Sequence, residues 1–268
     1  MGNVADNLID ARTLDADLGR VRVFDTRWKL NHPEHGQESY LSGHIPGAVF
    51  VDLDDDLSAP EGPGRHPLPD LATFAATLGR LGLNPEDEVV VYDDTAGTVA
   101  ARMWWMLRST GHDGVRVLDG GFEAWLEEDL PVDTGPVSPA ATTYPVPHGF
   151  SGVVDIEDLD GRILVDVRAA ERYEGKTEPV DPTPGHIPGA INIPSSEALA
   201  AGRFREPAEL ARIYGALENP VISCGSGVVA CHTALAIVES GRPIPEVFIG
   251  SYSEWSRAGR PVATGSQP

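Results

Sequence analysis

Residues 221–235, VISCGSGVVACHTAL, place a cysteine on a turn that contains two glycines. The apolar residues before Cys224 predict the end of a buried strand, and the apolar run 228–238 predicts the helix that follows. Backbone N–H groups at such a strand-to-helix turn, together with the helix dipole, stabilise an anion and favour a thiolate. Cys224 is therefore a candidate nucleophile. The alternative is a buried cysteine that packs as a small apolar side chain.

The remaining cysteine chemistry is limited. Cys231 lies seven residues after Cys224, about two helical turns further on, where we expect it to pack as an apolar helix residue. This spacing is unsuited to a disulfide, so both thiols are predicted to be reduced. A zinc site built from Cys224, Cys231 and His232 lacks a fourth ligand at any usual spacing. No nucleotide-binding fingerprint occurs, and we predict neither a metal nor a cofactor.

The composition excludes several classes of partner. A length of 268 residues has room for one large or two ordinary domains, and 41% hydrophobic residues are typical of a globular protein. The net charge of −21 argues against nucleic acid and against an anionic membrane as partners, and an anionic substrate would require a local positive pocket. The sequence has neither an apolar stretch long enough to span a bilayer nor the pattern of a secretory leader, which predicts a cytoplasmic location.

The sequence contains two copies of one unit. The hexapeptide GHIPGA occurs twice, each time after a β-branched run that ends in Asp-x-Arg, and each copy closes on a similar segment around a tryptophan. We predict an N-terminal domain over 1–134, a linker rich in Pro, Thr and Ser over 135–150, and a C-terminal domain over 151–268. The paired segments are 20–27 with 161–168, 43–48 with 185–190, and 119–132 with 249–262.

The two copies differ by an insert. GHIPGA recurs after 142 residues but the tryptophan recurs after 130, from Trp125 to Trp255, so the first copy carries about 12 extra residues. The segment SAPEGPGRHPLP, residues 58–69, is the candidate insert. In the same alignment Asp94 of the first copy takes the position of Cys224.

Short strands alternate with helical stretches along both copies. This alternation predicts an α/β fold in which each copy forms a mostly parallel sheet flanked by helices. Ligands of such sheets bind beyond the carboxyl ends of the strands, and Cys224 follows one of those ends.

The tandem copies with GHIPGA, the cysteine loop in the second copy and the terminal segment around tryptophan together resemble the two-domain rhodanese family of sulfurtransferases, over about residues 7 to 263. The resemblance implies two tandem rhodanese-like domains, of which the N-terminal one is non-catalytic. It implies that Cys224 takes a sulfane sulfur from a small-molecule donor as a persulfide. A thiophilic acceptor, such as a thiol, thioredoxin or cyanide, then removes that sulfur. The predicted persulfide-binding residues are Gly225, Gly227, Val228, Val229 and Ala230.

The loop sequence favours one sulfur donor. Family members that prefer thiosulfate resemble C-R-K-G-V-T-A, whose cations suit a doubly charged donor, whereas members that prefer 3-mercaptopyruvate resemble C-G-S-G-V-T-A. This chain reads CGSGVVA, with Val229 in place of the usual threonine and no cation in the loop. We therefore expect 3-mercaptopyruvate as the donor, with thiosulfate:cyanide transfer through the same persulfide as the alternative.

The mercaptopyruvate branch also implies a proton relay. Its members have a loop serine that acts with a histidine and an aspartate from a segment resembling F-x-D-x-D…H-x-L-P. The matching segments here are FVDLD (50–54) and HPLP (66–69), which assign the relay to Ser226, His66 and Asp54. The alternatives are an exposed loop histidine at 66 and a solvated charge at 54.

Donor binding is assigned to an arginine. Arg172 matches the family arginine that binds the donor's carboxylate, and its planar guanidinium suits such bidentate recognition. The mercaptopyruvate branch usually has a second arginine after Glu-Pro, where this chain has Val180 and Asp181 instead. Arg168 and Lys176 are the candidate substitutes.

Two further classes of function are alternatives to sulfur transfer. A cysteine phosphatase needs the pattern C-x5-R, but Ala230 stands where the arginine is required. A sulfur carrier or binding module, in which Cys224 is modified but turns over slowly, is the non-enzymatic alternative.

Overall fold

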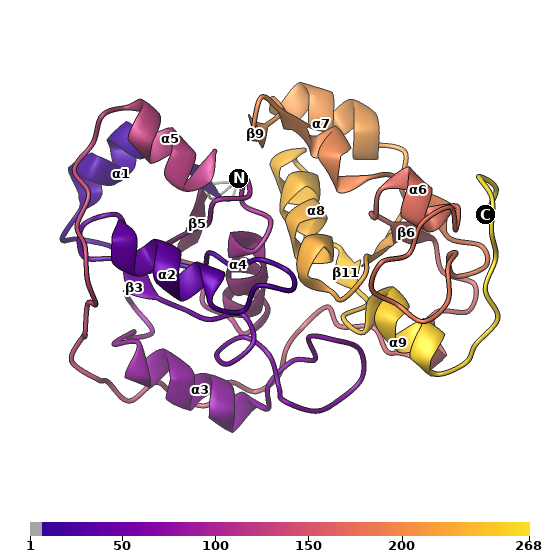
Figure 1. Cartoon of the computed structure of the whole chain (residues 1–268), viewed down its shortest axis with the longest axis horizontal. Coiled ribbons are helices and arrows are strands. Elements are labelled where there is room, and N and C mark those ends of the chain that lie inside the picture. The colour runs from indigo at the N-terminus through magenta and orange to yellow at the C-terminus, as the bar shows by residue number, and fades with distance from the viewer. Residues whose placement is uncertain (1–6) are drawn as a thin grey trace. The chain divides into compact units, whose positions relative to one another are not determined.

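The central strands are rich in valine and isoleucine, whose β-branched side chains fit a pleated surface that is buried on both faces. The computed structural model describes residues 7–268, so the first six residues of the predicted N-terminal domain lie outside the described part. The described chain forms two compact units (Figure 1). Unit 1 comprises residues up to 59 together with 69–151, and unit 2 comprises residues 60–68 together with 152–268.

Unit 1 contains a five-stranded sheet in the order β1-β5-β4-β2-β3, in which every neighbouring pair is parallel. Its strands are β1 (Leu8–Ile9), β2 (Arg22–Asp25), β3 (Val49–Phe50), β4 (Val89–Tyr92) and β5 (Val115–Leu118). Its helices are α1 (Ala11–Asp17), α2 (His35–Ser42), α3 (Leu71–Arg80), α4 (Ala100–Ser109) and α5 (Gly121–Glu127).

Unit 2 repeats this order as β11-β10-β6-β7, again with parallel pairs, and a single parallel bridge between Val153 and Val247 takes the place of the edge strand. A short antiparallel pair, β8 with β9, lies outside this sheet. The strands are β6 (Leu164–Asp166), β7 (Ile191–Asn192), β8 (Leu199–Ala200), β9 (Arg203–Phe204), β10 (Val221–Ser223) and β11 (Glu246–Val247). The helices are η1 (Ile156–Asp158), α6 (Ala170–Tyr173), η2 (Ser195–Ala198), α7 (Pro207–Tyr214), α8 (Val228–Glu239) and α9 (Ser251–Arg257).

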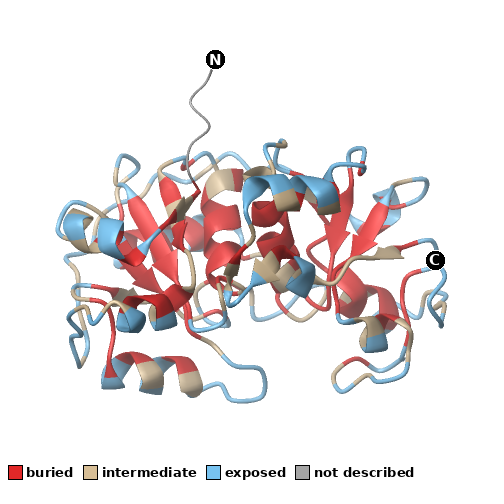
Figure 2. Cartoon of the chain, turned by 90° about the horizontal axis from the view of Figure 1, so that it is seen from above, coloured by how far each residue is buried: buried red, intermediate tan, exposed pale blue. Residues whose placement is uncertain are grey.

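Each sheet is covered on both faces. In unit 1, Val90 and Tyr92 of β4 share a buried cluster with Trp125 of α5. Val89 and Val91 are equally buried and point to the opposite face, because side chains alternate along a strand. Figure 2 shows the buried residues gathered on the strands and on the helix faces toward them. The predicted fold class, a mostly parallel sheet flanked by helices in each of two tandem copies, is confirmed.

The repeated sequence motifs form the same buried contact in both units. The Arg27 guanidinium donates to Asp25, two residues before it, and through Nη2 to the carbonyl of Gly43 at 2.7 Å, where GHIPGA begins. In unit 2, Arg168 donates to Asp166 and to the carbonyl of Gly185, each at 2.7 Å. The Asp-x-Arg motif therefore fixes the GHIPGA turn beside the central strands.

The closing tryptophans have matching roles. The indole Nε1 of Trp125 donates to the carbonyl of Pro131 at 2.8 Å, and that of Trp255 donates to the carbonyl of Pro261 at 2.7 Å. Each bond ties the last helix of a unit to the segment after it. The predicted linker, 135–150, lies along unit 1, where the N–H of Thr142 donates to the carbonyl of Gly79 at 2.8 Å.

The insert is structured as part of unit 2. Residues 60–68 are assigned to unit 2 although they lie within the first copy in sequence. The N–H of Arg65 donates to Ser253 Oγ at 3.1 Å, and Arg257 Nη1 donates to the carbonyl of Gly64 at 3.1 Å. The insert therefore brings side chains from the first half of the sequence to the carboxyl end of β10.

The Asp25–Arg27 pair gives a test of the repeated contact. We expect Arg27→Met to lower the free energy of unfolding by about 3–5 kcal/mol, because it leaves a buried carboxylate without its partner. Adding Asp25→Asn to Arg27→Met should recover part of this loss, since no buried charge then remains. Urea unfolding of the two variants and the wild type measures the difference. A double variant no more stable than the single one would contradict this account.

Candidate active site

Cys224 directly follows the last residue of β10, and a loop of three residues separates it from the start of α8. Its side chain is buried, and the N–H of Gly227 points at Sγ from 3.1 Å. Gly227 has φ +78°, and a Cβ on it would lie 2.3 Å from the carbonyl oxygen of Ile249. Both the backbone angle and the close approach require glycine here. Ser251 Oγ accepts from the N–H of Cys224 at 3.0 Å, which fixes the start of the loop.

The corresponding loop of unit 1 holds a carboxylate. Asp93 follows β4, is fully buried, and accepts four backbone N–H groups of the loop that leads into α4. Burial raises the pKa of Asp93, and the four hydrogen bonds act against this rise. The donors are Thr95 and Gly97 to Oδ1, each at 2.8 Å, and Val99 and Ala100 to Oδ2, at 2.6 and 2.9 Å.

The structure corrects the predicted equivalence of Asp94 and Cys224. The carbonyl of Asp93 accepts from the N–H of Phe122 at 2.8 Å, and the carbonyl of Cys224 accepts from the N–H of Tyr252 at 3.1 Å in the same way. Asp93 is therefore the counterpart of Cys224, and the prediction of Asp94 was wrong by one residue. The reason is the loop length, since Asp93 lies four residues before Gly97 but Cys224 lies three before Gly227.

This equivalence shows where loop donors lie in unit 2. Gly97 and Gly227 have similar backbone angles, φ +83° and +78°, and each donates its N–H to the residue that follows the strand. By the same count Val229 and Ala230 correspond to Val99 and Ala100, whose N–H groups bind Asp93 Oδ2. Val228, Val229 and Ala230 form the first turn of α8. The N–H groups of Val229 and Ala230 are therefore candidates for further donors to the Cys224 sulfur, besides the N–H of Gly227.

Two predicted relay residues are in direct contact. His66 Nδ1 lies 2.8 Å from Ser226 Oγ, and both side chains are buried. The insert carries His66 to the loop, so 160 residues of sequence separate the two partners. A hydroxyl and an imidazole in this arrangement can pass a proton between them.

Asp54 is placed differently. It belongs to unit 1, where its carboxylate accepts from the indole Nε1 of Trp28 at 2.8 Å. Its part in the relay stays a prediction.

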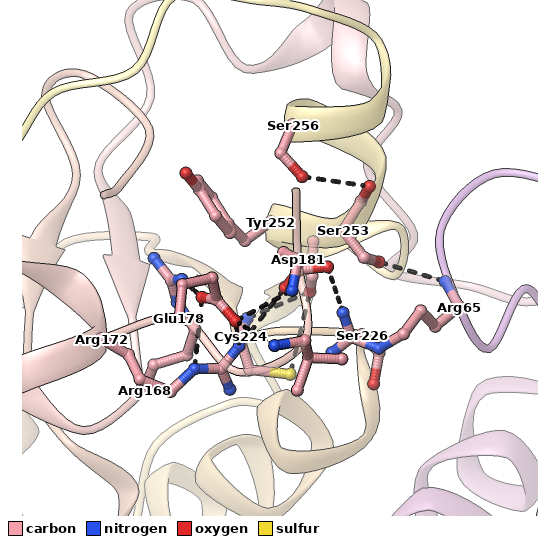
Figure 3. Close-up of polar contacts among 12 residues, drawn as sticks. Arg65, Arg168, Arg172, Glu178, Asp181, Cys224, Ser226, Tyr252, Ser253 and Ser256 are labelled. Atoms are coloured by element: carbon pink, nitrogen blue, oxygen red, sulfur yellow. Dashed lines mark hydrogen bonds and ion pairs between the residues drawn. The ribbon is translucent and has the colours of Figure 1, made fainter. Parts of the chain in front are cut away.

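Arg172 lies on α6 in a network of buried carboxylates (Figure 3). Its Nη2 donates to Glu178 at 2.7 Å and to Asp181 at 3.3 Å. Burial disfavours the charged form of Glu178, but hydrogen bonds from Arg172 and from the N–H groups of Asp181 and Val180 outweigh it and lower its pKa. Val180 and Asp181, which replace the expected second arginine, therefore help to hold the first one.

The predicted substitutes for that second arginine are engaged elsewhere. Arg168 is buried and binds Asp166, Glu178 and the carbonyl of Gly185. Lys176 is largely exposed and pairs with Glu174.

Sequence reasoning missed Arg65. Its Nη1 forms an ion pair with Asp181, and its Nη2 lies 2.7 Å from the point where a Cβ on Gly225 would be. The available signal was its place directly before His66 in the insert, since a chain that brings one residue to the loop brings its neighbour as well.

The second cysteine, metal binding and membrane-spanning helices were the remaining questions raised by the sequence, and the described residues answer them. Cys231 is buried with its Sγ 3.2 Å from the carbonyl of Gly227, and both cysteines are free thiols. Residues 7–268 contain no group of three or more His, Cys, Asp and Glu side chains that could hold a metal ion. No helix in that range has the length and apolar character to cross a membrane.

Comparison with known proteins identifies the family. The rhodanese-like domain family matches residues 4–128 and again 154–258. The chain belongs to the rhodanese family. A probable 3-mercaptopyruvate sulfurtransferase of Pseudomonas aeruginosa is 41% identical over 96% of this chain and 98% of its own length. A putative thiosulfate sulfurtransferase, SseB, of Mycobacterium tuberculosis is 41% identical over 92% of each chain. The structure of 3-mercaptopyruvate sulfurtransferase from Leishmania major has a TM-score of 0.87 at 30% identity, covering 97% of this chain and 76% of that one.

These relatives are enzymes that match this rhodanese chain over nearly its whole length. The protein is therefore a sulfurtransferase with two rhodanese-like domains, and its substrates are small-molecule sulfur donors and acceptors.

The loop geometry predicts a difference between the two glycines that flank α8. Gly227 and Gly241 both have a left-handed φ, but a Cβ on Gly241 would meet nothing within 4 Å. We expect Gly227→Ala to lose most sulfurtransferase activity and to destabilise the protein by about 1–3 kcal/mol or more, because the added methyl meets the Ile249 carbonyl. Gly241→Ala should keep activity near that of the wild type. Equal activity in both variants, measured by sulfur-transfer rates and thermal unfolding, would contradict the assigned role of the loop.

Proposed function

We propose that this sulfurtransferase moves a sulfane sulfur from 3-mercaptopyruvate, through a persulfide on Cys224, to a thiophilic acceptor. The observation that carries the proposal is the loop shared by the two units. In unit 1 its N–H groups bind the buried Asp93 carboxylate, and in unit 2 the same turn surrounds a buried cysteine. A low-molecular-weight thiol, thioredoxin or cyanide is the proposed acceptor, and the cytoplasm is the proposed location.

The first half-reaction transfers sulfur to the enzyme. The Cys224 thiolate attacks the sulfur of 3-mercaptopyruvate, the carbon–sulfur bond breaks, and its electron pair passes to the carbon, giving the enolate of pyruvate. Protonation of the enolate at carbon or oxygen releases pyruvate. The proton of the donor's thiol balances that protonation, so the sulfur remains on Cys224 as a persulfide whose negative charge lies on the outer atom. In the second half-reaction the acceptor attacks that outer sulfur and regenerates the Cys224 thiolate.

The loop has the features that a persulfide requires. An anion buried without a cation needs several donors directed at it, and N–H groups at a helix start provide them. Gly225, Gly227, Val228, Val229 and Ala230 are the proposed donors. Their counterparts in unit 1 include N–H groups that bind both oxygens of a carboxylate, an anion of comparable charge.

Ser226 and His66 are the proposed proton donors to the departing enolate. Their contact of 2.8 Å supports a relay in which the hydroxyl delivers the proton and the imidazole replaces it. Asp54 is the proposed third member, orienting the imidazole.

The N-terminal domain, proposed over 1–134, is non-catalytic in this scheme. Its loop has no sulfur, and the Asp93 carboxylate already occupies the donors that a persulfide would need. The C-terminal domain, proposed over 151–268, supplies the nucleophile.

Thiosulfate is the alternative donor. The relative from Mycobacterium tuberculosis carries the name of a thiosulfate sulfurtransferase, and two guanidinium groups lie near Gly225. The neutral loop CGSGVVA favours 3-mercaptopyruvate, because a dianion would lack a cation within the loop.

The donor and the nucleophile are tested together. We expect kcat/KM with cyanide as acceptor to be at least about tenfold higher for 3-mercaptopyruvate than for thiosulfate. Cys224→Ser should reduce both to background, because serine cannot form a persulfide, whereas Cys231→Ala should remain active. Double-reciprocal plots of the initial rate at several acceptor concentrations should be parallel, since pyruvate leaves before the acceptor reacts. Intersecting plots would exclude the persulfide scheme, a thiosulfate preference would overturn the donor, and very slow turnover with both donors would favour a sulfur carrier.

The relay is tested by Ser226→Ala and His66→Gln. We expect each to lower kcat with 3-mercaptopyruvate about 100-fold, and the double variant to lose little more, because the two side chains act as one unit. His148→Gln, at an exposed histidine of the linker, is the control. Losses that multiply in the double variant would show that Ser226 and His66 act independently.

A further inference from the structure

Two arginines from distant parts of the sequence share one buried carboxylate. Arg65 of the insert pairs with Asp181 Oδ1, and Arg172 of α6 donates to Asp181 Oδ2 at 3.3 Å. Asp181 lies between the two guanidinium groups (Figure 3). Its carboxylate holds both of them in fixed positions on the same side of the cysteine loop.

The two arginine side chains are partly accessible, whereas the side chains of the two carboxylates are not. The side chains of Asp181 and Glu178 are 0% exposed, whereas those of Arg65 and Arg172 are 14% and 22% exposed. Arg65 also has a hydrogen-bond donor that is not used within the described part of the protein. Arg65 Nε is buried and has no hydrogen-bond partner among residues 7–268. A buried N–H without an acceptor is costly, so this group is expected to meet one in a ligand complex.

Both guanidinium groups lie next to the residue that follows Cys224. A Cβ on Gly225 would lie 2.7 Å from Arg65 Nη2 and 3.5 Å from Arg172 Nη1. The backbone of Gly225 does not have a left-handed φ, so the absence of a side chain serves to leave room for these groups. In 3-mercaptopyruvate only the carbonyl carbon separates the carboxylate from the carbon that bears sulfur. A donor whose sulfur meets Cys224 must therefore place its carboxylate close to the loop.

We propose that Arg65 is a carboxylate-binding residue of the donor site, acting with Arg172 and held in place by Asp181. This inference rests on the proposed function, since it assigns the group that binds one end of the proposed donor. A guanidinium has two parallel N–H groups whose spacing matches the two oxygens of a carboxylate, so it can bind both oxygens at once. Arg65 thereby supplies, from the insert, the second cation that the segment after Glu178 lacks. In a chain with a net charge of −21, two partly accessible guanidinium groups provide local donors directed at an anionic substrate.

The competing role for Arg65 is structural. Its ion pair with Asp181 and its N–H bond to Ser253 also anchor the insert that carries His66. A purely anchoring residue would affect every donor equally, because all donors need His66 and Cys224. A carboxylate-binding residue would affect only donors that have a carboxylate.

The experiment compares two donors that differ in that group. Mercaptoacetone keeps the thiol and the ketone of 3-mercaptopyruvate but has a methyl group in place of the carboxylate. We expect Arg65→Met to lower kcat/KM for 3-mercaptopyruvate about 10- to 100-fold, mainly through KM, and to change kcat/KM for mercaptoacetone by less than about threefold. Arg257→Ala, which removes an exposed anchor of the same insert, is the matched control and should leave the ratio of the two donors unchanged.

Three results decide the question. A loss confined to 3-mercaptopyruvate supports the assignment. An equal loss with both donors shows that Arg65 only anchors the insert, and no loss with either shows that it is outside the donor site; both overturn the assignment.

A binding measurement separates this inference from the proposed function. Calorimetric titration of 3-mercaptopyruvate into Cys224→Ser, with and without Arg65→Met, requires no turnover. If the wild type fails to use 3-mercaptopyruvate, the proposed function fails. The role of Arg65 then still stands on a tenfold or greater loss of affinity in the double variant, and is overturned by an unchanged affinity.

Discussion

The burial of a negative charge at the start of a helix is the constraint that shapes unit 1 and, in the proposed function, unit 2. Water cannot solvate such a charge, so the backbone must supply the donors, and these must come from a loop short enough to direct them inward. In unit 1 the charge is the Asp93 carboxylate with its four N–H bonds. In unit 2 the loop holds Cys224, and Gly227 adopts the angle that turns its N–H toward the sulfur. A similar backbone turn thus holds a carboxylate in unit 1 and, in the proposed function, a persulfide in unit 2.

The loop can differ between the units because other contacts fix its first residue and the strand beside it. Arg27 in unit 1 and Arg168 in unit 2 each join a strand-end aspartate to the GHIPGA turn, and these contacts are nearly identical in distance. The carbonyl of the residue after the strand binds the N–H of Phe122 in unit 1 and of Tyr252 in unit 2. Since these bonds involve backbone atoms of Asp93 and Cys224, they do not depend on which side chain is present. That independence explains why the motifs are shared while the loops have diverged.

The sequence was sufficient to predict features that depend on local pattern. The parallel sheets follow from alternating strand and helix patterns, and the place of Cys224 follows from an apolar strand followed by glycines. The pairing of His66 with Ser226 came from the family resemblance and could not be derived from spacing, because 160 residues separate them. The sequence alignment pairs Cys224 with Asp94 instead of Asp93, because it applies a single offset across two loops that differ in length by one residue. Arg65 was missed because its position depends on how the insert packs, and no local pattern reports on that.

The source of the cations bears on donor selectivity. Lysine or arginine within the loop would attract any small dianion, whatever its shape. Here the cations come from residues 168–172 and from the insert, and buried carboxylates hold each of them. The guanidinium groups of Arg65, Arg168 and Arg172 lie against Asp166, Glu178 and Asp181. The charges of this network balance, so long-range attraction contributes little and binding depends on matching the N–H directions. In the proposed function, a planar carboxylate two atoms further from the reactive sulfur than the oxygens of thiosulfate fits those directions. We therefore expect selectivity to depend on the geometry of the arginines more than on their number.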